Sequence, residues 1–238
     1  MNSRPHYFSD PETCSYLPEQ ICRMEYEVAD DLTTEEYTGR ILRGWRRFGV
    51  SLFRPQCLAC RGCLSLRVDV ARFQPTRSQQ RNRKKNQRQI ELERGKPRLT
   101  PEKLELFDRF HHFQAGHRGW AEHQSNDVWS YTGSFLANPI PTEEWTYRLN
   151  GQLVGLGFVD ILPFEGLSAI YFVHDPNHRD LGLGVWNVLS LIEECRAQRL
   201  PHLYLGYYVR GCQSLEYKGN FVPSQILGPE GSWVDFPG

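Results

Sequence analysis

A pattern of strand and helix signals in the second half of the chain limits the fold most. Asn150-Gly151 separates two apolar-rich segments, and Asn-Gly in that position is the turn signal of a two-residue β-hairpin. Three strands, a helix and a further strand are expected in turn over residues 144–149, 152–161, 167–173, 184–199 and 201–209. This order predicts an α/β (α+β) fold with a mixed, mostly antiparallel sheet.

A glycine-containing loop precedes the expected helix. It reads Arg179-Asp-Leu-Gly182-Leu-Gly184, of the form Arg-x-x-Gly-x-Gly. Glycines at a helix N-terminus let backbone amides approach an anion closely. The loop resembles the acyl-donor loop of the GCN5-related N-acetyltransferase fold, in which amides and an arginine hold a pyrophosphate. A plain helix-capping loop is the alternative interpretation. The resemblance implies a donor whose phosphates bind near Arg179, Gly182 and Gly184.

The first half of the chain contains a strongly basic segment. The formal net charge of the whole chain is zero, yet residues 72–98 hold ten Lys or Arg against two Glu. That window therefore carries +8 and the remainder −8. Clustered cations release counterions from a nucleic-acid backbone, and no aromatic residue lies within 77–88, which favours phosphate contact over base recognition. A solvated helix face is the alternative. The residues predicted to contact nucleic-acid phosphates are Arg81, Arg83, Lys84, Lys85 and Arg88.

Three of the seven cysteines are evenly spaced. Cys57, Cys60 and Cys63 offer three thiolates, whereas a tetrahedral metal site generally needs a fourth ligand. Cys14 is the predicted fourth ligand and Cys22 is the alternative. Zinc and an iron-sulfur cluster both accept thiolate ligation, so both metals remain open. Buried free thiols are the competing interpretation.

The odd cysteine count favours free thiols or metal ligation over disulfides, as in a reducing compartment. The first ten residues lack the apolar core of a signal peptide, and no segment approaches membrane-spanning length. We therefore expect a cytoplasmic globular protein without membrane contact.

Two domains are expected, 1–95 and 96–238, because Gly95-Lys-Pro97 interrupts the chain. In the first, a capping box at Thr33–Glu36 predicts a helix over 37–48 that Gly49 ends. The other elements expected around the boundary are strands over 50–53 and 65–70 and helices over 77–88 and 100–113.

Several separated motifs then point to one family. They are Cys14-x-Tyr-Leu-Pro18, Arg54-Pro-x-Cys57-x-x-Cys60-x-x-Cys63, Phe73-x-Pro-x-Arg-Ser-Gln79, Gly166-Leu-Ser-Ala-Ile-Tyr171, Tyr204-Leu-Gly-Tyr207, Gly211-Cys212 and Tyr217-Lys218. Together they resemble the arginyl-tRNA protein transferase family and its bacterial branch, the aspartate/glutamate leucyltransferases. The resemblance covers nearly the whole chain.

The resemblance implies transfer of leucine or arginine from aminoacyl-tRNA to the N-terminal α-amine of proteins that begin with Asp or Glu, which marks them for degradation in the N-degron pathway. It implies tandem GCN5-like halves. In eukaryotic relatives an N-terminal cysteine set binds an iron-sulfur cluster, and the matching residues here are Cys14, Cys57, Cys60 and Cys63. The adjacent cysteine pair of that branch is absent from this sequence.

Such a reaction needs little acid-base machinery, because the aminoacyl ester is already activated. The acceptor α-amine, with a pKa of about 7.7 to 8.0, is neutral in a useful fraction at cellular pH, so no cofactor is required for the chemistry. Asp160 is expected to take a proton or orient the amine, and tyrosine hydroxyls, with Tyr207 as the candidate, to stabilise the oxyanion. Arg77 is expected to hold the acceptor's carboxylate, and Lys218 is the competing candidate for that role. Lys218 is also a candidate catalytic residue.

Four histidines, His111, His112, His117 and His123, lack metal-ligand spacing and are expected to be surface or capping residues. Two other functions are compatible with the sequence: an acetyl-CoA-dependent N-acetyltransferase and a non-catalytic, metal-stabilised RNA-binding protein. DNA is not an expected partner.

Overall fold

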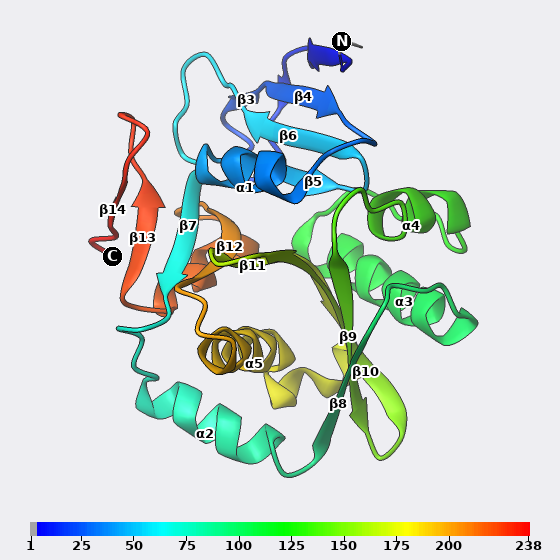
Figure 1. Cartoon of the computed structure of the whole chain (residues 1–238). Coiled ribbons are helices and arrows are strands. Elements are labelled where there is room, and N and C mark those ends of the chain that lie inside the picture. The colour runs from blue at the N-terminus through cyan, green and yellow to red at the C-terminus, as the bar shows by residue number, and fades with distance from the viewer. Residues whose placement is uncertain (1–3) are drawn as a thin grey trace.

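The computed structural model describes residues 4–238, which form two sheets flanked by helices (Figure 1). Residues 1–3, which belong to the predicted first domain and to the segment scored for a signal peptide, lie outside the described residues. No helix within residues 4–238 is long and apolar enough to cross a membrane.

A small antiparallel sheet, at the top of Figure 1, is built from the first part of the chain. Its strand order is β1-β4-β6-β5, and the bounds are β1 His6–Phe8, β4 Met24–Val28, β6 Ser51–Pro55 and β5 Arg46–Phe48. A separate two-stranded hairpin consists of β2 Glu12–Thr13 and β3 Ile21–Cys22. The expected strand over 50–53 is thus confirmed as β6.

Helix α1, Thr34–Leu42, begins at the predicted capping box of Thr33 and Glu36 but ends six residues before the expected end. Gly44 follows with a φ of +81°, a left-handed conformation that glycine adopts without strain and that ends the helix. The next residues, Arg46–Phe48, form the edge strand β5. The prediction of one helix through residue 48 was therefore wrong at its C-terminal end.

The large sheet has the order β14-β13-β7-β12-β11-β10-β9-β8, and every neighbouring pair except β11 and β12 is antiparallel. The bounds are β7 Leu64–Asp69, β8 Ile90–Gly95, β9 Thr142–Leu149, β10 Gln152–Leu162, β11 Gly166–His174, β12 His202–Tyr208, β13 Ser224–Leu227 and β14 Trp233–Asp235. The predicted mixed α/β fold class, with a mostly antiparallel sheet, is confirmed.

Helices cover both faces of the large sheet (Figure 1). One core cluster contains the buried apolar residues of α5, Leu183–Ala197, among them Val188, Leu189, Ile192 and Cys195, and Val185 is partly buried against it. A second cluster, on α3 Pro101–Arg118 and α4 Val128–Phe135, packs on β10 and β11. Helix α2, Arg77–Asn86, lies against α5.

The parallel pair β11 and β12 stays hydrogen-bonded for only three residues on each strand. The ladder joins Gly166–Ser168 to His202–Tyr204, although β11 continues to His174 and β12 to Tyr208. Gly206, with a φ of +78°, follows a register shift in β12. The two strands therefore separate toward their carboxyl ends, and we call this region the β11–β12 opening.

The chain near Gly95 does not separate two sheets. Strand β7 precedes that residue and β8 ends at it, and both belong to the same large sheet as strands β9 to β14. The short helices α6 Gln213–Glu216, η2 Tyr217–Asn220 and η1 Pro176–Leu181 complete the fold. A domain boundary near residue 95 stays a prediction.

Candidate functional site

The basic helix and the glycine loop, about a hundred residues apart in the sequence, lie in contact. The Asn82 side-chain amide donates to the carbonyl oxygens of Leu181 at 2.9 Å and Gly182 at 3.2 Å. The buried Asn86 amide donates to the same Leu181 oxygen at 2.8 Å. These bonds fix α2 beside the N-terminus of α5.

Gly182 and Gly184 differ in whether the structure leaves room for a side chain. Gly182 has a φ of +58°, and a Cβ on it would lie 2.7 Å from the Asn82 amide nitrogen, so both backbone strain and α2 exclude a side chain. A Cβ on Gly184 would meet nothing within 4 Å. Gly182 is the N-cap of α5 and supplies no side-chain hydrogen bond. Within residues 4–238, the amides of Leu183 and Gly184 have no hydrogen-bond acceptor, as an anion site at a helix N-terminus requires, whereas the Val185 amide donates to the Gly182 carbonyl at 3.0 Å.

The outer face of α2 is strongly basic. Arg83 turns toward Glu193 at 3.2 Å and Lys85 pairs with Asp180 at 3.0 Å. Within residues 4–238, the other basic side chains of the segment have no carboxylate partner; they are Arg77, Arg81, Lys84 and Arg88. A surface hollow of about 470 Å³ is lined by Arg81, Lys84, Lys85, Arg88 and Gln89. This face can neutralise a polyanion.

Arg179 and Arg77 lie at the edges of this face. Arg179 is exposed, and its guanidinium carbon lies 4.8 Å from the ring centre of Phe113. Arg77 is exposed at the first residue of α2.

Arg46 of β5 connects the small sheet to the β11–β12 opening. One terminal nitrogen donates to the Ser168 hydroxyl at 2.9 Å, and the other donates to the carbonyl oxygen of Ala169. Across the opening, a Cβ on Gly206 would lie 3.2 Å from Arg46 Nε. Arg46 is buried, and its positive charge therefore lies between the two separating strands. Because residue 46 fell inside a predicted helix, sequence reasoning missed this residue; the glycine at 44 was the available signal.

Lys218 and Tyr207 lie at the β12 side of the opening. Lys218 Nζ donates to the Tyr207 carbonyl oxygen at 3.1 Å, and within residues 4–238 it has no carboxylate partner. Burial, together with the charge of Arg46, lowers the pKa of Lys218 to about 7. The pKa of Tyr207 is raised by burial, and its hydroxyl donates to the Gly44 carbonyl at 3.0 Å. Lys218 can therefore carry a neutral amine at neutral pH.

Asp160 lies in a closed ion-pair network instead. The side chains of Asp160 and Arg47 are both fully buried. Arg47 Nε donates to Asp160 Oδ2 at 2.9 Å, and the Thr142 hydroxyl donates to Oδ1 at 2.8 Å. Arg47 also donates to Gly49 O and Asn138 Oδ1, at 2.8 and 2.9 Å. With both carboxylate oxygens engaged, this position favours a structural role for Asp160 over the predicted catalytic one.

The cysteines of the small-sheet region lie near one another. Burial, with neighbouring thiols, raises the pKa of Cys22 and of Cys63 to about 12. Within residues 4–238, however, no group of three or more His, Cys, Asp or Glu side chains is placed to hold a metal ion. A zinc or iron-sulfur site on Cys14, Cys57, Cys60 and Cys63 stays a prediction.

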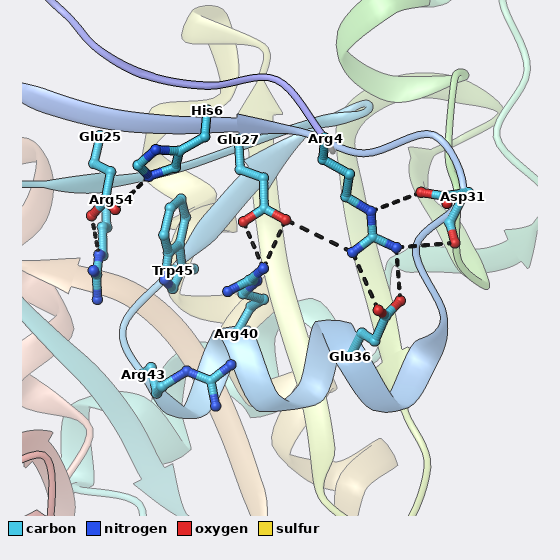
Figure 2. A pocket seen from close by; sticks show the side chains of 10 residues that line it. All are labelled: Arg4, His6, Glu25, Glu27, Asp31, Glu36, Arg40, Arg43, Trp45 and Arg54. Carbon is cyan, nitrogen blue, oxygen red and sulfur yellow. Dashed lines mark hydrogen bonds and ion pairs between the residues drawn. The ribbon is translucent and has the colours of Figure 1, made fainter. Parts of the chain in front are cut away.

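A charged hollow of about 810 Å³ lies between α1 and one face of the small sheet (Figure 2). Its charges are largely paired with one another: Arg4 with Asp31 at 2.8 Å and with Glu36 at 3.0 Å, Arg40 with Glu27 at 2.7 Å, Arg54 with Glu25 at 2.5 Å, and His6 with Glu25 at 2.8 Å. The network holds β1, β4 and β6 to one another and to α1. Because arginine and histidine side chains already pair with the carboxylates of the hollow, these ion pairs stabilise the small sheet.

His111 is neither the surface residue nor the capping residue that the sequence suggested. It lies half-buried on α3, with Nδ1 2.7 Å from the Phe107 carbonyl oxygen and Nε2 2.8 Å from the Tyr171 hydroxyl. Since a carbonyl can only accept, Nδ1 carries the proton and Nε2 accepts from Tyr171. No local sequence signal indicated this contact, which joins residues 60 positions apart.

Comparison with known proteins agrees with these features. The family description "Arginine-tRNA-protein transferase, C terminus" matches residues 102–228, and its N-terminal counterpart matches residues 12–81. The chain is 33% identical to a protein named aspartate/glutamate leucyltransferase from Campylobacter jejuni, over 91% of this chain and 90% of that protein. It is 32% identical to one of the same name from Helicobacter hepaticus, over 93% and 91%.

Among solved structures, FemX matches with a TM-score of 0.50 at 7% identity, over 92% of this chain and 85% of that chain. A GCN5-related glucosamine N-acetyltransferase region of a fungal β-N-acetylglucosaminidase has a TM-score of 0.44 at 13% identity, over 84% and 22%. The match to FemX shows a similar overall fold. With family matches at both ends and relatives over most of its length, the chain is an enzyme of the arginine-tRNA-protein transferase family.

Proposed function

We propose that this enzyme transfers leucine from charged tRNA to the N-terminal α-amine of proteins that begin with Asp or Glu. Relatives named aspartate/glutamate leucyltransferase support leucine over arginine and support acidic acceptors. The observation that carries the proposal is the contact of the basic helix α2 with the glycine loop, through Asn82. It combines a polyanion-binding face and an anion-binding helix N-terminus in one surface.

In the proposed complex, the tRNA backbone lies on the outer face of α2. Arg81, Lys84 and Arg88 have no carboxylate partner within residues 4–238, so they are available for phosphates. The amides at the start of α5 and the exposed Arg179 then receive phosphates close to the 3′ end. The aminoacyl ester enters the β11–β12 opening from this side.

The reaction replaces an ester by an amide. The acceptor nitrogen attacks the ester carbonyl carbon, the C–N bond forms, and the bond to the ribose oxygen breaks. The amine loses a proton, and the leaving 3′ oxygen gains one. We assign the first proton to Lys218, whose pKa of about 7 leaves a large neutral fraction at cellular pH. Positioning supplies the remaining acceleration.

The acceptor's side-chain carboxylate needs a cation near the opening. Arg46 lies between β11 and β12, is buried, and always carries its charge, so we assign the carboxylate to it. Arg77, the residue expected from the sequence, remains the competing candidate on α2. The residues at the opening supply the chemistry without a cofactor.

The test uses purified enzyme with radiolabelled leucyl-tRNA, arginyl-tRNA or acetyl-CoA, and peptides that begin with Asp, Glu, Lys or Ala. Label should pass from leucyl-tRNA to the Asp and Glu peptides only. Transfer from arginyl-tRNA alone would change the donor, and transfer from acetyl-CoA alone would replace the proposal by N-acetylation. Since charged tRNA is the donor, we also propose a cytoplasmic location for the enzyme.

A further inference from the structure

An aromatic row crosses the small sheet on one face. Tyr7 of β1 lies opposite Tyr26 of β4, Tyr26 lies opposite Phe53 of β6, and Phe53 lies opposite Arg46 of β5. Directly opposed residues of antiparallel strands point to the same face. The Tyr7 and Tyr26 rings stack with centres 5.2 Å apart, and the Tyr26 and Phe53 centres are 6.4 Å apart. We call Tyr7, Tyr26 and Phe53 the aromatic row.

The row is not the core of the small sheet. Side chains alternate between the faces of a strand, so Glu25 and Glu27 of β4 point away from Tyr26, toward α1 and the charged hollow (Figure 2). Tyr7 is 49% exposed, and Tyr26 and Phe53 are half-buried. Phe53 packs on the cluster of Tyr207, Val209 and Cys212, and the row becomes exposed toward Tyr7. A partly exposed aromatic row on a strand face is suited to contact with another chain.

Arg46 connects the row to the proposed site. The last member of the row, Phe53, lies opposite Arg46, whose guanidinium reaches Ser168 and the β11–β12 opening. Three strand spacings of about 4.8 Å separate Arg46 from Tyr7, roughly 14 Å in all, which is the length of about four residues of extended chain. The row therefore extends from the opening to the edge of the sheet.

We propose that the aromatic row binds the residues that follow the acidic N-terminal residue of the acceptor protein. This inference rests on the proposed function, in which Arg46 holds the first residue's carboxylate. Apolar side chains at positions 2 to 5 of the acceptor then pack on Phe53, Tyr26 and Tyr7, and the enzyme selects its acceptors by these positions as well as by the first.

Charge favours a polypeptide over RNA as the occupant. Residues 4–64, which include the small sheet, contain eight Lys or Arg against nine Asp or Glu, a net charge of −1. The window from 72 to 98 holds ten against two, and its helix α2 lies at the far side of the molecule from the small sheet in Figure 1. A phosphate backbone is attracted to the second region and not to the first.

The experiment compares two acceptor peptides, Asp-Leu-Phe-Val-Ser-Lys and Asp-Gly-Ser-Gly-Ser-Lys, with leucyl-tRNA as the donor. We expect the wild-type kcat/KM to be about tenfold higher for the apolar peptide, the size expected of a few aromatic contacts. Tyr7→Ser and Tyr26→Ser should reduce kcat/KM for the apolar peptide and leave the polar peptide unchanged. Trp129→Ser, at an 89% exposed position on α4, is the matched control and should change neither value.

Tyr7 lies on an edge strand and is half-exposed, so Tyr7→Ser should fold, which a thermal melt checks. Equal wild-type efficiency with both peptides would overturn the inference while leaving the proposed function intact. A raised KM for leucyl-tRNA in the row variants, the same with both peptides, would assign the row to RNA and also overturn it. No transfer to either peptide would overturn the proposed function and this inference together.

Discussion

Asp160→Asn should reduce stability strongly without removing the chemistry. The Asp160 and Arg47 side chains are both fully buried, and Arg47 donates hydrogen bonds to Asp160, Thr142, Asn138 and the Gly49 carbonyl. Neutralising one member of a buried pair leaves the other charge uncompensated, at a cost of about 3 to 5 kcal/mol. In a chain of this size that loss lowers the melting temperature by roughly 6 to 20 °C.

The assay is thermal denaturation followed by circular dichroism, with single-turnover leucine transfer measured well below the variant's melting temperature. Asp31→Asn is the control, because Asp31 also pairs with an arginine, Arg4 at 2.8 Å, but is 72% exposed. Such an exposed pair contributes about 0 to 1 kcal/mol. An Asp160→Asn enzyme with normal stability and an abolished single-turnover rate would refute the structural assignment and restore the catalytic one.

Three further predictions concern the proposed site. Lys218→Met should remove the part of the kcat/KM profile that rises with pH through about 7. Only the neutral amine of Lys218 accepts a proton, and its pKa is lowered to about 7. A pH profile identical to that of the wild type would exclude Lys218 as the base. Arg81→Gln should reduce the slope of log Kd for tRNA against log salt by about 0.7 to 0.9, and an unchanged slope would remove that phosphate contact. Gly182→Ala should weaken tRNA binding and lower the melting temperature, since its Cβ would lie 2.7 Å from the Asn82 amide at a left-handed φ. A Cβ on Gly184 has open space, so Gly184→Ala should change stability little. Equal melting temperatures for the two variants would contradict this packing argument.

Much of the local structure follows from short-range sequence signals. The Asn150-Gly151 turn lies between β9 and β10, as expected. Thr76, with Gln79, forms a capping box that begins α2 in the basic segment. These features are local because a turn or a helix start satisfies its hydrogen bonds within a few residues. One helix end was misjudged, since Gly44 could be read either as a tolerated helix residue or as a terminator.

The candidate site could be predicted only in part. The glycine loop, the basic run and the family motifs are each a short continuous segment of the sequence, so residue types and spacing reveal them. Arg46, by contrast, gains its position from a hydrogen bond to a residue 122 positions away. The same limit explains His111, whose partner on β11 is distant in the chain.

By itself, then, the sequence determined those strands and helices that have short-range signals, the fold class and the family. The tertiary structure alone decided which ionisable side chains are paired with another residue of the protein and which are available for substrate. Asp160 looked chemically available at a strand end, but packing brings Arg47 to it and closes the pair. Lys218 was predicted from the sequence as a competing or catalytic group, and burial beside Arg46 lowers its pKa so that it loses its proton more readily. Ionisable side chains take their role from solvent exposure and from partners far along the chain, and only the packed fold establishes both.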